Sequence, residues 1–324
     1  MKDKTALVLG AGGFIGSHLV KDLVSNGYWT RGVDLKHPQW TPSPANDFVI
    51  GDLRDPDLVR EVIDRPFDEV YQLAADMGGA GYLFTGHNDA DVMHNSALIN
   101  LNVAEYGYRR SIKKLFYSSS ACVYPKYNQT DPANPRTPEN SVSPASPDSE
   151  YGWEKLFSER LYDAFHRNRG LDIRVVRFHN VYGPEGAWND GREKAPAAIC
   201  RKVAETPDGG TIPIWGPGSQ TRSFMFIYDA IDGIEKIMEA PYTGPINLGS
   251  SEMISINDLT GKILDISGKA LEVVNVPGPV GVMGRTSDNT KIKYDLNWEP
   301  WMTLDNGLPI LYDWIESQVN GGNG

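Results

Sequence analysis

Apolar and polar positions in the first half of the chain follow a regular alternation. Short apolar runs have the length of buried strands, and the stretches between them space their apolar residues as amphipathic helices do. The predicted strands are residues 5–10, 30–34, 47–52, 69–74, 113–118 and 172–178, and the predicted helices include 14–26, 56–64, 89–110 and 151–169. This alternation predicts βαβ units, and therefore an α/β fold with a doubly wound parallel sheet.

The regular alternation ends after Gly183, which indicates a smaller second lobe. We expect a helix from about Pro196 and two isolated strands at 211–216 and 271–277. The helical stretch SFMFIYDAIDGIEKIME and the apolar run PINLGSS are then expected to return the chain to the first lobe. The predicted boundaries are a first domain of residues 1–178 plus about 224–250, and a smaller, interleaved α/β substrate-binding lobe of about 179–223 and 251–324.

Residues 125–147 contain six prolines among Asn, Ser, Asp and Thr residues. Proline fixes φ and lacks a backbone N–H, so this composition excludes a helix or a central strand. We expect an ordered loop over the functional site, and a candidate lid.

A glycine-rich turn follows the first predicted strand and opens the first predicted helix. Its sequence, GAGGFIG, places Gly10, Gly13 and Gly16 where side chains would block a pyrophosphate from the backbone N–H groups. Phe14 and Ile15 complete this turn. The alternative is a glycine turn without a ligand, but the order of strand, turn, helix and acidic residue favours a Rossmann-type dinucleotide site.

An acidic residue, Asp34, ends the second predicted strand. It is placed to accept hydrogen bonds from an adenosine ribose, and no arginine follows directly to bind a 2′-phosphate. This favours NAD over NADP, although Arg31 and Lys36 lie nearby. Asp52, after the third strand, is a candidate for the adenine amine, whereas Asp55 has the pattern of a helix N-cap.

Charge and cysteine content narrow the class of protein. The formal net charge is -11, so we do not expect a nucleic acid as partner. Cys122 and Cys200 are the only cysteines in the sequence, which is no disulfide framework and fits the reducing cytoplasm. We expect neither a signal peptide nor a membrane span, and the scattered histidines predict no metal site.

Tyr151 and Lys155 lie four positions apart in a predicted helix, so their side chains face the same side. A lysine ammonium beside a phenol favours the phenolate, which lowers the pKa of Tyr151 toward neutral and makes it a usable base. Ser120, at the end of the neighbouring strand, is expected to share the proton and orient a substrate hydroxyl.

With these motifs the sequence resembles the extended short-chain dehydrogenase/reductase superfamily over nearly its full length. More narrowly, it is similar to the GDP-mannose 3,5-epimerase family. The similar blocks are AADMGGAGY, SSSACVYP, YGWEK, RFHNVYGPEG, GREKAPAAICRK, GSQTRSFMFI and GRTSDN. The resemblance implies an isomerase with a tightly bound NAD that is recycled in each turnover. It also implies a nucleotide-diphosphate sugar substrate, GDP-mannose, inverted at C3 and/or C5 beside a transient ketone at C4.

A second pair of catalytic residues follows from the same resemblance. A C4 ketone acidifies the C–H bonds at C3 and C5, and inversion needs a base on one face of the sugar and an acid on the other. Cys122 and Lys194 match the family's cysteine and lysine in this role. The alternatives are an inert buried cysteine and a solvated surface lysine. Cys200 is expected to be a packing residue.

The substrate-binding residues are also carried over from the family. Glu193 adjoins Lys194 and is expected to tune or position it. The residues expected to hold the diphosphate, the nucleotide and the sugar are Gly78, Gly79, Asn180, Lys202, Gln220 and Arg285. His179 is either an orienting residue beside the site or a buried histidine with satisfied hydrogen bonds.

Other functions remain open on the same residues. A nucleotide-sugar 4-epimerase needs the serine, tyrosine, lysine and NAD, but has no use for Cys122 or Lys194. A catalytically silent NAD-binding scaffold is the alternative from a different class. A 4,6-dehydratase is disfavoured because its expected Asp–Glu pair is replaced by Ala121 and Cys122.

Apolar residues recur at helical spacing in 89–110 and 151–169. Related enzymes pair two such helices with those of a second copy, so we expect a homodimer. A buried core face would explain the same pattern.

Overall fold

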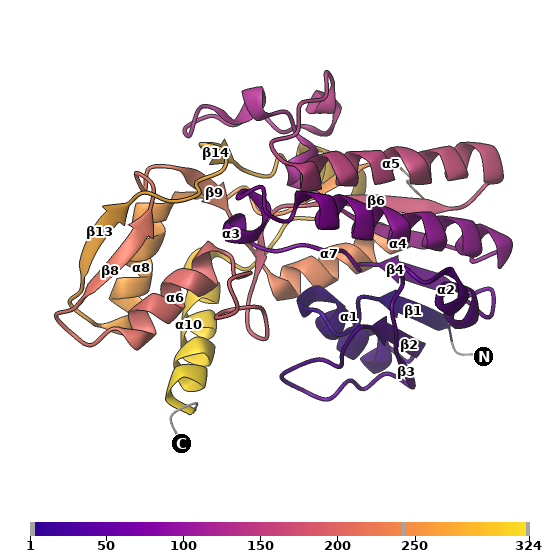
Figure 1. The fold of residues 1–324 in the computed structure, drawn as a ribbon, viewed down its shortest axis with the longest axis horizontal. Helices are drawn as coiled ribbons and strands as arrows, with labels where there is room; N and C mark the ends of the chain where they lie inside the picture. The colour runs from indigo at the N-terminus through magenta and orange to yellow at the C-terminus, as the bar shows by residue number, and fades with distance from the viewer. Residues whose placement is uncertain (1–3, 242–243, 322–324) are drawn as a thin grey trace.

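A seven-stranded sheet forms the centre of the computed structural model, which describes residues 4–241 and 244–321 (Figure 1). The strands lie in the order β11-β6-β5-β4-β1-β2-β3, and all of their pairings are parallel. Their bounds are β1 Thr5–Leu9, β2 Trp29–Asp34, β3 Asp47–Ile50, β4 Glu69–Gln72, β5 Leu115–Ser120, β6 Ile173–Phe178 and β11 Ile246–Leu248. The predicted α/β class with a doubly wound parallel sheet is confirmed.

Helices cover both faces of this sheet. Their bounds are α1 Phe14–Ser25, α2 Pro56–Val62, α4 Asp89–Arg109, α5 Glu150–Arg169 and α7 Ile227–Glu239. Side chains of a strand alternate between its two faces. Ala6 and Val8 of β1 accordingly join the core beneath α1 and α7, whereas Leu7 and Leu9 join the core beneath α2, α4 and α5. The apolar run of β1 is therefore buried on both sides, whereas β3 at the edge of the sheet is only partly buried.

Local signals set the ends of α5, the helix that carries Tyr151 and Lys155. Ser149 caps its N-terminus by accepting a hydrogen bond from the Gly152 N–H at 3.3 Å. Gly170 ends it with φ at 71°, a left-handed conformation that glycine adopts without strain. The predicted stop at Gly170 is confirmed.

The second half of the chain adds three small sheets and further helices. β7 Val181–Tyr182 pairs with β10 Met225–Phe226, and β9 Thr221–Ser223 lies between β12 Met253–Ser255 and β14 Gly284–Arg285. The further helices of the second half are α6 Ala195–Glu205, α8 Ile256–Ser267, α9 Thr290–Leu296 and α10 Leu304–Gly321, and the short helix α3 Ala80–Leu83 follows β4 in the first half. None of the helices within residues 4–241 and 244–321 combines the length and apolarity needed to cross a membrane.

The two strands predicted as isolated pair with each other. β8 Thr211–Trp215 and β13 Glu272–Val276 form a parallel two-stranded sheet, with Ile212 opposite Val273. The prediction of isolated strands was wrong. The two strands lie about 60 residues apart in the chain, and pairing between such distant segments leaves no local signal in the sequence.

The proline-rich loop contains only short turns of 3-10 helix. They are η2 Lys126–Gln129 and η3 Glu139–Val142. Gln129 and Thr137 are fully buried, and the Thr137 hydroxyl donates to the Thr286 carbonyl at 2.6 Å. The loop is therefore ordered by contacts with the last part of the chain, beside β14 (Figure 1).

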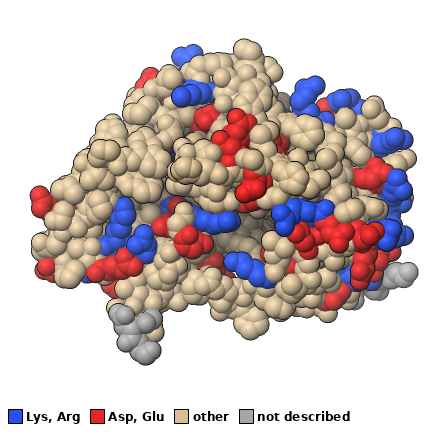
Figure 2. All heavy atoms as spheres, viewed as in Figure 1, with Lys and Arg blue, Asp and Glu red and all other residues tan. Residues whose placement is uncertain are grey.

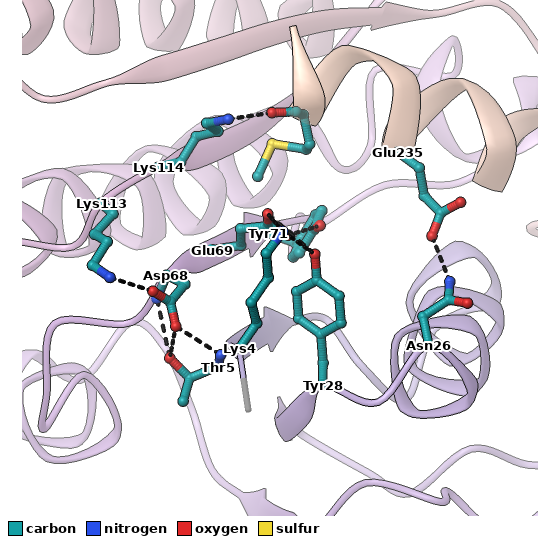
Figure 3. A network of polar contacts seen from close by, with 11 residues as sticks. Lys4, Thr5, Asn26, Tyr28, Asp68, Glu69, Tyr71, Lys113, Lys114 and Glu235 are labelled. Carbon is teal, nitrogen blue, oxygen red and sulfur yellow. Dashed lines mark hydrogen bonds and ion pairs between the residues drawn. The ribbon is translucent and has the colours of Figure 1, made fainter. Parts of the chain in front are cut away.

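A polar network joins the strands at their amino ends (Figure 3). The Asp68 carboxylate accepts from the Thr5 backbone N–H at 2.8 Å and from the Lys113 ammonium at 2.5 Å. The Tyr71 hydroxyl donates to Glu69 at 2.6 Å. These contacts join the amino ends of β1, β4 and β5. Ligands bind at the opposite, carboxyl ends of the strands in folds of this kind.

Candidate active site

A cavity of about 890 Å³ runs along the carboxyl ends of the central strands and extends into the second half of the chain. The space-filling view shows a hollow near the middle of the molecule, with Lys and Arg side chains beside it (Figure 2). All of the predicted site residues lie on the cavity wall: Gly10, Gly13, Phe14, Ile15, Gly16, Asp34, Asp52, Gly78, Gly79, Ser120, Cys122, Tyr151, Lys155, Asn180, Glu193, Lys194, Lys202, Gln220 and Arg285.

The glycine-rich turn has the geometry of a pyrophosphate cradle. Gly10 has φ at 91°, and a Cβ there would lie 2.8 Å from the Ala74 backbone nitrogen. A Cβ on Gly16 would lie 2.0 Å from the Gly10 carbonyl oxygen. Gly13 is the N-cap of α1 and provides no side-chain cap, so the first N–H groups of the helix stay open to a ligand. These residues fit the diphosphate of a dinucleotide.

Asp34 lies beside this cradle. Its carboxylate accepts the Gly12 N–H at 2.9 Å, while burial raises the pKa of Asp34 and this hydrogen bond opposes the rise. Arg31 instead binds Asp47 at 2.7 Å and Asp64 at 3.2 Å. Since those two carboxylates already hold the Arg31 guanidinium, the side chains fit the ribose of NAD better than the 2′-phosphate of NADP.

Asp52 and Asp55 lie at the next strand end. The Asp52 carboxylate pairs with Arg54 at 2.6 Å, and this arginine lowers the pKa of Asp52. Asp55 accepts from the Asp57 N–H at 2.9 Å and caps α2, so the N-cap interpretation is confirmed.

Tyr151, Lys155 and Ser120 lie together at the start of α5 and the end of β5. The Lys155 ammonium lies 5.5 Å from the centre of the Tyr151 ring and donates to the Ser118 carbonyl at 3.0 Å. Burial raises the pKa of Tyr151 well above its ordinary value, whereas a hydrogen bond with Ser120 lowers it. Burial also lowers the pKa of Lys155.

The expectation that Lys155 lowers the pKa of Tyr151 toward neutral is therefore wrong. The physical reason is desolvation, because burial removes the water that would stabilise a phenolate, and the nearby Cys122 and Glu154 also raise the pKa of Tyr151. Additional positive charge in the site would be needed to reverse this direction.

Cys122 lies in a single turn of 3-10 helix, η1 Ala121–Val123, that directly follows β5. The Ser120 hydroxyl caps this turn by accepting the Cys122 N–H at 3.2 Å. Ser120 therefore orients the cysteine and faces the same cavity as Tyr151.

The sulfur of Cys122 contacts a buried arginine. Nη1 of Arg285 donates to Sγ at 3.2 Å, and Nη2 of Arg285 binds the Asp148 carboxylate at 2.9 Å. The structure thus places Arg285, predicted to hold the diphosphate end, next to the predicted acid/base cysteine.

Lys194 is the N-cap residue of α6, and its side chain makes no hydrogen bond to the described residues. Burial lowers the pKa of Lys194, Cys122 opposes this, and Arg285 adds to it. The neighbouring Glu193 accepts from Arg201 at 3.1 Å through Oε1, while its buried Oε2 has no partner among the described residues. An unpaired buried carboxylate oxygen on a cavity wall is suited to a ligand hydroxyl.

The other predicted substrate residues come from several loops. A Cβ on Gly79 would lie 2.4 Å from the Glu193 carbonyl oxygen, so this glycine allows two loops to touch. Asn180 donates to the Ser223 carbonyl at 3.1 Å, and Lys202 donates to the Pro213 carbonyl at 2.6 Å. Gln220 donates to the Trp215 carbonyl at 3.0 Å, and its buried Oε1 is unpaired among the described residues.

Cys200 and His179 lie in the core beside the site. Cys200 is fully buried in the main core, as expected of a packing residue. His179 is also fully buried and faces Asn247 Oδ1 at 3.1 Å, and burial lowers its pKa to about 3. Nδ1 of His179 has no partner among the described residues, so the histidine is only partly satisfied.

Many residues around the cavity were not predicted, and the following four are examples. Asp148 and Gln129 hold Arg285, and Arg222 and Trp215 lie on the cavity wall. Arg222 lies within GSQTRSFMFI, one of the blocks that resemble the family, so its charge within that block could have indicated a site residue. Asp148 and Gln129 have no signal of their own because only the fold brings them to Arg285.

Comparison with known proteins gives the family. A model of the NAD dependent epimerase/dehydratase family matches residues 6–249. The chain belongs to this family. GDP-mannose 3,5-epimerase 1 of Oryza sativa subsp. indica is 41% identical over 314 residues, which cover 96% of this chain and 82% of that protein. GDP-mannose 3,5-epimerase of Arabidopsis thaliana is 40% identical over the same shares. The resemblance to this group, and the prediction of an epimerase, are confirmed.

Solved structures of nucleotide-sugar epimerases have the same fold. UDP-glucose 4-epimerase of Thermotoga maritima, solved with UDP-glucose, matches with a TM-score of 0.85 and 26% identity, covering 97% of this chain and 99% of that one. UDP-glucuronic acid 4-epimerase of Bacillus cereus, in complex with UDP-glucuronic acid and NAD, matches with a TM-score of 0.81 and 27% identity over the same shares.

Proposed function

We propose that this enzyme inverts GDP-mannose at C5 and C3 through a transient ketone at C4. The observation that carries the proposal is that Cys122 and Lys194 share one cavity wall with Ser120, Tyr151 and Lys155. An epimerase that acts at C4 alone has no use for the first two residues. The plant relatives named GDP-mannose 3,5-epimerase support the same substrate.

The glycine-rich turn and Asp34 would hold NAD tightly, so that one cofactor molecule serves successive turnovers. When bound, NAD supplies the reversible oxidation of the sugar C4 hydroxyl to a ketone. Tyr151 accepts the hydroxyl proton, Lys155 stabilises the phenolate, and Ser120 orients the hydroxyl. Asp52 would hold the adenine end.

Cys122 and Lys194 exchange the protons of the carbons beside the ketone. The Arg285 guanidinium stabilises a negatively charged sulfur, and burial lowers the pKa of Lys194 from its ordinary value, which makes that amine a better proton donor. Inversion at C5 alone gives GDP-L-gulose, and inversion at both carbons gives GDP-L-galactose.

The remaining wall residues would bind the substrate. The unpaired oxygens of Glu193 and Gln220 are acceptors for hydroxyl or N–H groups. Basic side chains of the second half outnumber acidic ones on the wall, which suits a diphosphate; they are Arg192, Lys194, Arg201, Lys202, Arg222 and Arg285. Gly78 and Gly79 would adjoin the sugar, and Asn180 would hold the diphosphate and nucleotide end.

Incubation with GDP-mannose in D2O tests this proposal. We expect solvent deuterium at C5 and C3 of the recovered sugar nucleotides, because enolisation exchanges those protons with solvent. Epimerisation at C4 without label at either carbon would instead support a nucleotide-sugar 4-epimerase. Failure of the sugar nucleotide to reduce bound NAD in a single turnover would support a non-catalytic scaffold.

We also propose a homodimer that uses the outer surfaces of α4 and α5. These two helices lie side by side (Figure 1) and expose large apolar side chains: Leu101, Tyr108, Trp153 and Phe157. Exposed apolar groups gathered on neighbouring helices are typical of an interface. Light scattering should give twice the mass of the chain, and a monomer would contradict the proposal.

Two further expectations complete the proposal. Residues 1–178 with about 224–250 would bind NAD, and about 179–223 with 251–324 would bind the sugar nucleotide. Cys122 and Cys200 are both unpaired, which supports a reducing compartment such as the cytoplasm.

A further inference from the structure

Asp148 is a buried acid that touches the site without lining it. It directly precedes Ser149, the N-cap of α5, and its side chain is 3% exposed. Its carboxylate accepts from Nη2 of Arg285 at 2.9 Å. Asp148 does not form part of the described cavity wall, so any effect it has on the chemistry must pass through another residue.

That residue is Arg285, whose guanidinium has a different partner at each nitrogen. Nε donates to Gln129 Oε1 at 2.5 Å, Nη1 to the Cys122 sulfur at 3.2 Å, and Nη2 to Asp148. Gln129 is anchored in turn, because its Nε2 donates to the Tyr124 carbonyl at 3.1 Å. A guanidinium is a rigid planar fork, so three fixed partners determine both its plane and its direction.

The positive charge of the Arg285 guanidinium lies next to the Cys122 sulfur. An N–H of a cation forms a stronger hydrogen bond with a thiolate than with a thiol. Other charged or titratable groups face the same region: Tyr151 and Lys155 from α5, Lys194 before α6, and Arg222 from β9. Burial and Arg285 lower the pKa of Arg222 to about 10, and Asp148 opposes this.

We propose that Asp148 is a positioning residue that holds the Arg285 guanidinium against the Cys122 sulfur and so keeps this sulfur able to accept a proton. The importance of this contact for catalysis rests on the proposed function. The contact itself is between side chains of the protein, so it is testable without any substrate.

The test is the pH dependence of Cys122 alkylation by iodoacetamide, followed by mass spectrometry of the modified residue. Asp148→Asn keeps an oxygen acceptor for Arg285, whereas Asp148→Ala removes it. Loss of the negative charge alone makes a thiolate easier to form, so this direct effect lowers the alkylation midpoint in both variants. Positioning predicts a midpoint at or below that of the parent for Asp148→Asn, but about one pH unit higher for Asp148→Ala. Equal or parallel shifts in the two variants would overturn the proposal.

Arg285→Gln provides a second test that does not leave a buried arginine without its counterion. Alone, it should raise the alkylation midpoint, since the cation at the sulfur is gone. Adding Asp148→Ala to it should then lower the midpoint or leave it unchanged, because no guanidinium remains to be held. A further rise, or no rise in Arg285→Gln itself, would overturn the proposal even if Asp148→Ala alone did not fold. Product formation from GDP-mannose is measured separately, so failure of the proposed function is distinguishable.

Discussion

Gly152, in the first turn of α5, lies directly against the backbone of Cys122. A Cβ at position 152 would be 2.2 Å from the Cys122 carbonyl oxygen and 2.9 Å from the Pro147 side chain. The helix that carries Tyr151 and the turn that carries Cys122 are thus in contact through bare backbone. The distance between these two side chains depends on the absence of a methyl group.

Gly152→Ala should therefore displace η1 from α5. We expect a loss of inversion activity of at least about tenfold, and destabilisation by about 1–3 kcal/mol, because an added methyl forces a backbone shift. Product formation and chemical denaturation measure the two effects. Gly261, within α8, is the matched control, since a Cβ there meets no atom within 4 Å. Gly261→Ala should keep full activity and be neutral or slightly stabilising.

Cys122→Ala and Lys194→Ala should each abolish inversion while leaving NAD bound, because neither side chain belongs to the glycine-rich cradle. Absorbance of the purified protein reports the cofactor, and product analysis reports inversion. Cys200→Ala is the control: it should cost about 1–2 kcal/mol of stability through lost packing and keep inversion. A parental rate in either of the first two variants would remove that residue from the mechanism.

Asp34→Ala should weaken NAD binding by about tenfold, equivalent to about 1.4 kcal/mol, since it removes the acceptor proposed for the ribose hydroxyls. Titration of cofactor-free protein measures this. Asp57→Asn, in an exposed ion pair with Arg60, should leave the affinity unchanged. Equal affinity of Asp34→Ala and the parent would contradict the assignment.

The buried ion pair between Arg177 and Glu159 is expected to dominate the stability of α5 against β6. The guanidinium donates to both carboxylate oxygens, at 2.9 and 2.7 Å, and both side chains are at least 95% buried, with exposed fractions of 2% and 5%. Glu159→Gln should cost about 3–5 kcal/mol, because it leaves a buried cation without its partner. Asp163→Asn, which breaks the exposed pair with Arg167 on the same helix, should cost less than about 1 kcal/mol. Similar losses in urea denaturation would contradict this ranking.

His179 should make stability depend on pH. Its pKa is about 3 in the folded protein because burial disfavours the charged ring, compared with about 6.5 when unfolded. Between these values the unfolded chain binds the extra proton, so stability falls as pH decreases from about 6.5 to about 3, by up to about 1.4 kcal/mol per pH unit. His179→Gln should reduce this slope in denaturation curves, and the exposed His87→Gln should not.

The central sheet and α5 were predictable because their signals are local. Helical spacing, the capping serine and Gly170 all lie within the segment, and the predicted helix 151–169 differs from the observed Glu150–Arg169 by one residue. Strand, glycine turn and acid occur in order along the chain, and parallel strands bring their carboxyl ends together. The glycine-rich turn, Asp34 and Ser120 were therefore predictable from local signals, whereas the substrate residues of the second half came from the family resemblance.

Contacts between distant segments were not predictable in the same way. Asp148 and Arg285 are 137 positions apart, and neither position alone indicates the other. The direction of the Tyr151 pKa was predicted wrongly because the spacing of Tyr151 and Lys155 reports a neighbouring charge but not the depth of burial. Desolvation is a property of the packed fold, and it is the largest cause of the raised pKa of Tyr151.

The position of Lys194 at the start of α6 links the site to the last helix of the chain. α6 packs along α10, so the backbone from which the Lys194 side chain projects is supported by residues that do not line the cavity. A crosslink or an inserted charge on the α6-facing surface of α10 would shift α6 and so change the position of the Lys194 amine. Engineering of proton transfer can therefore begin at α10, outside the cavity wall.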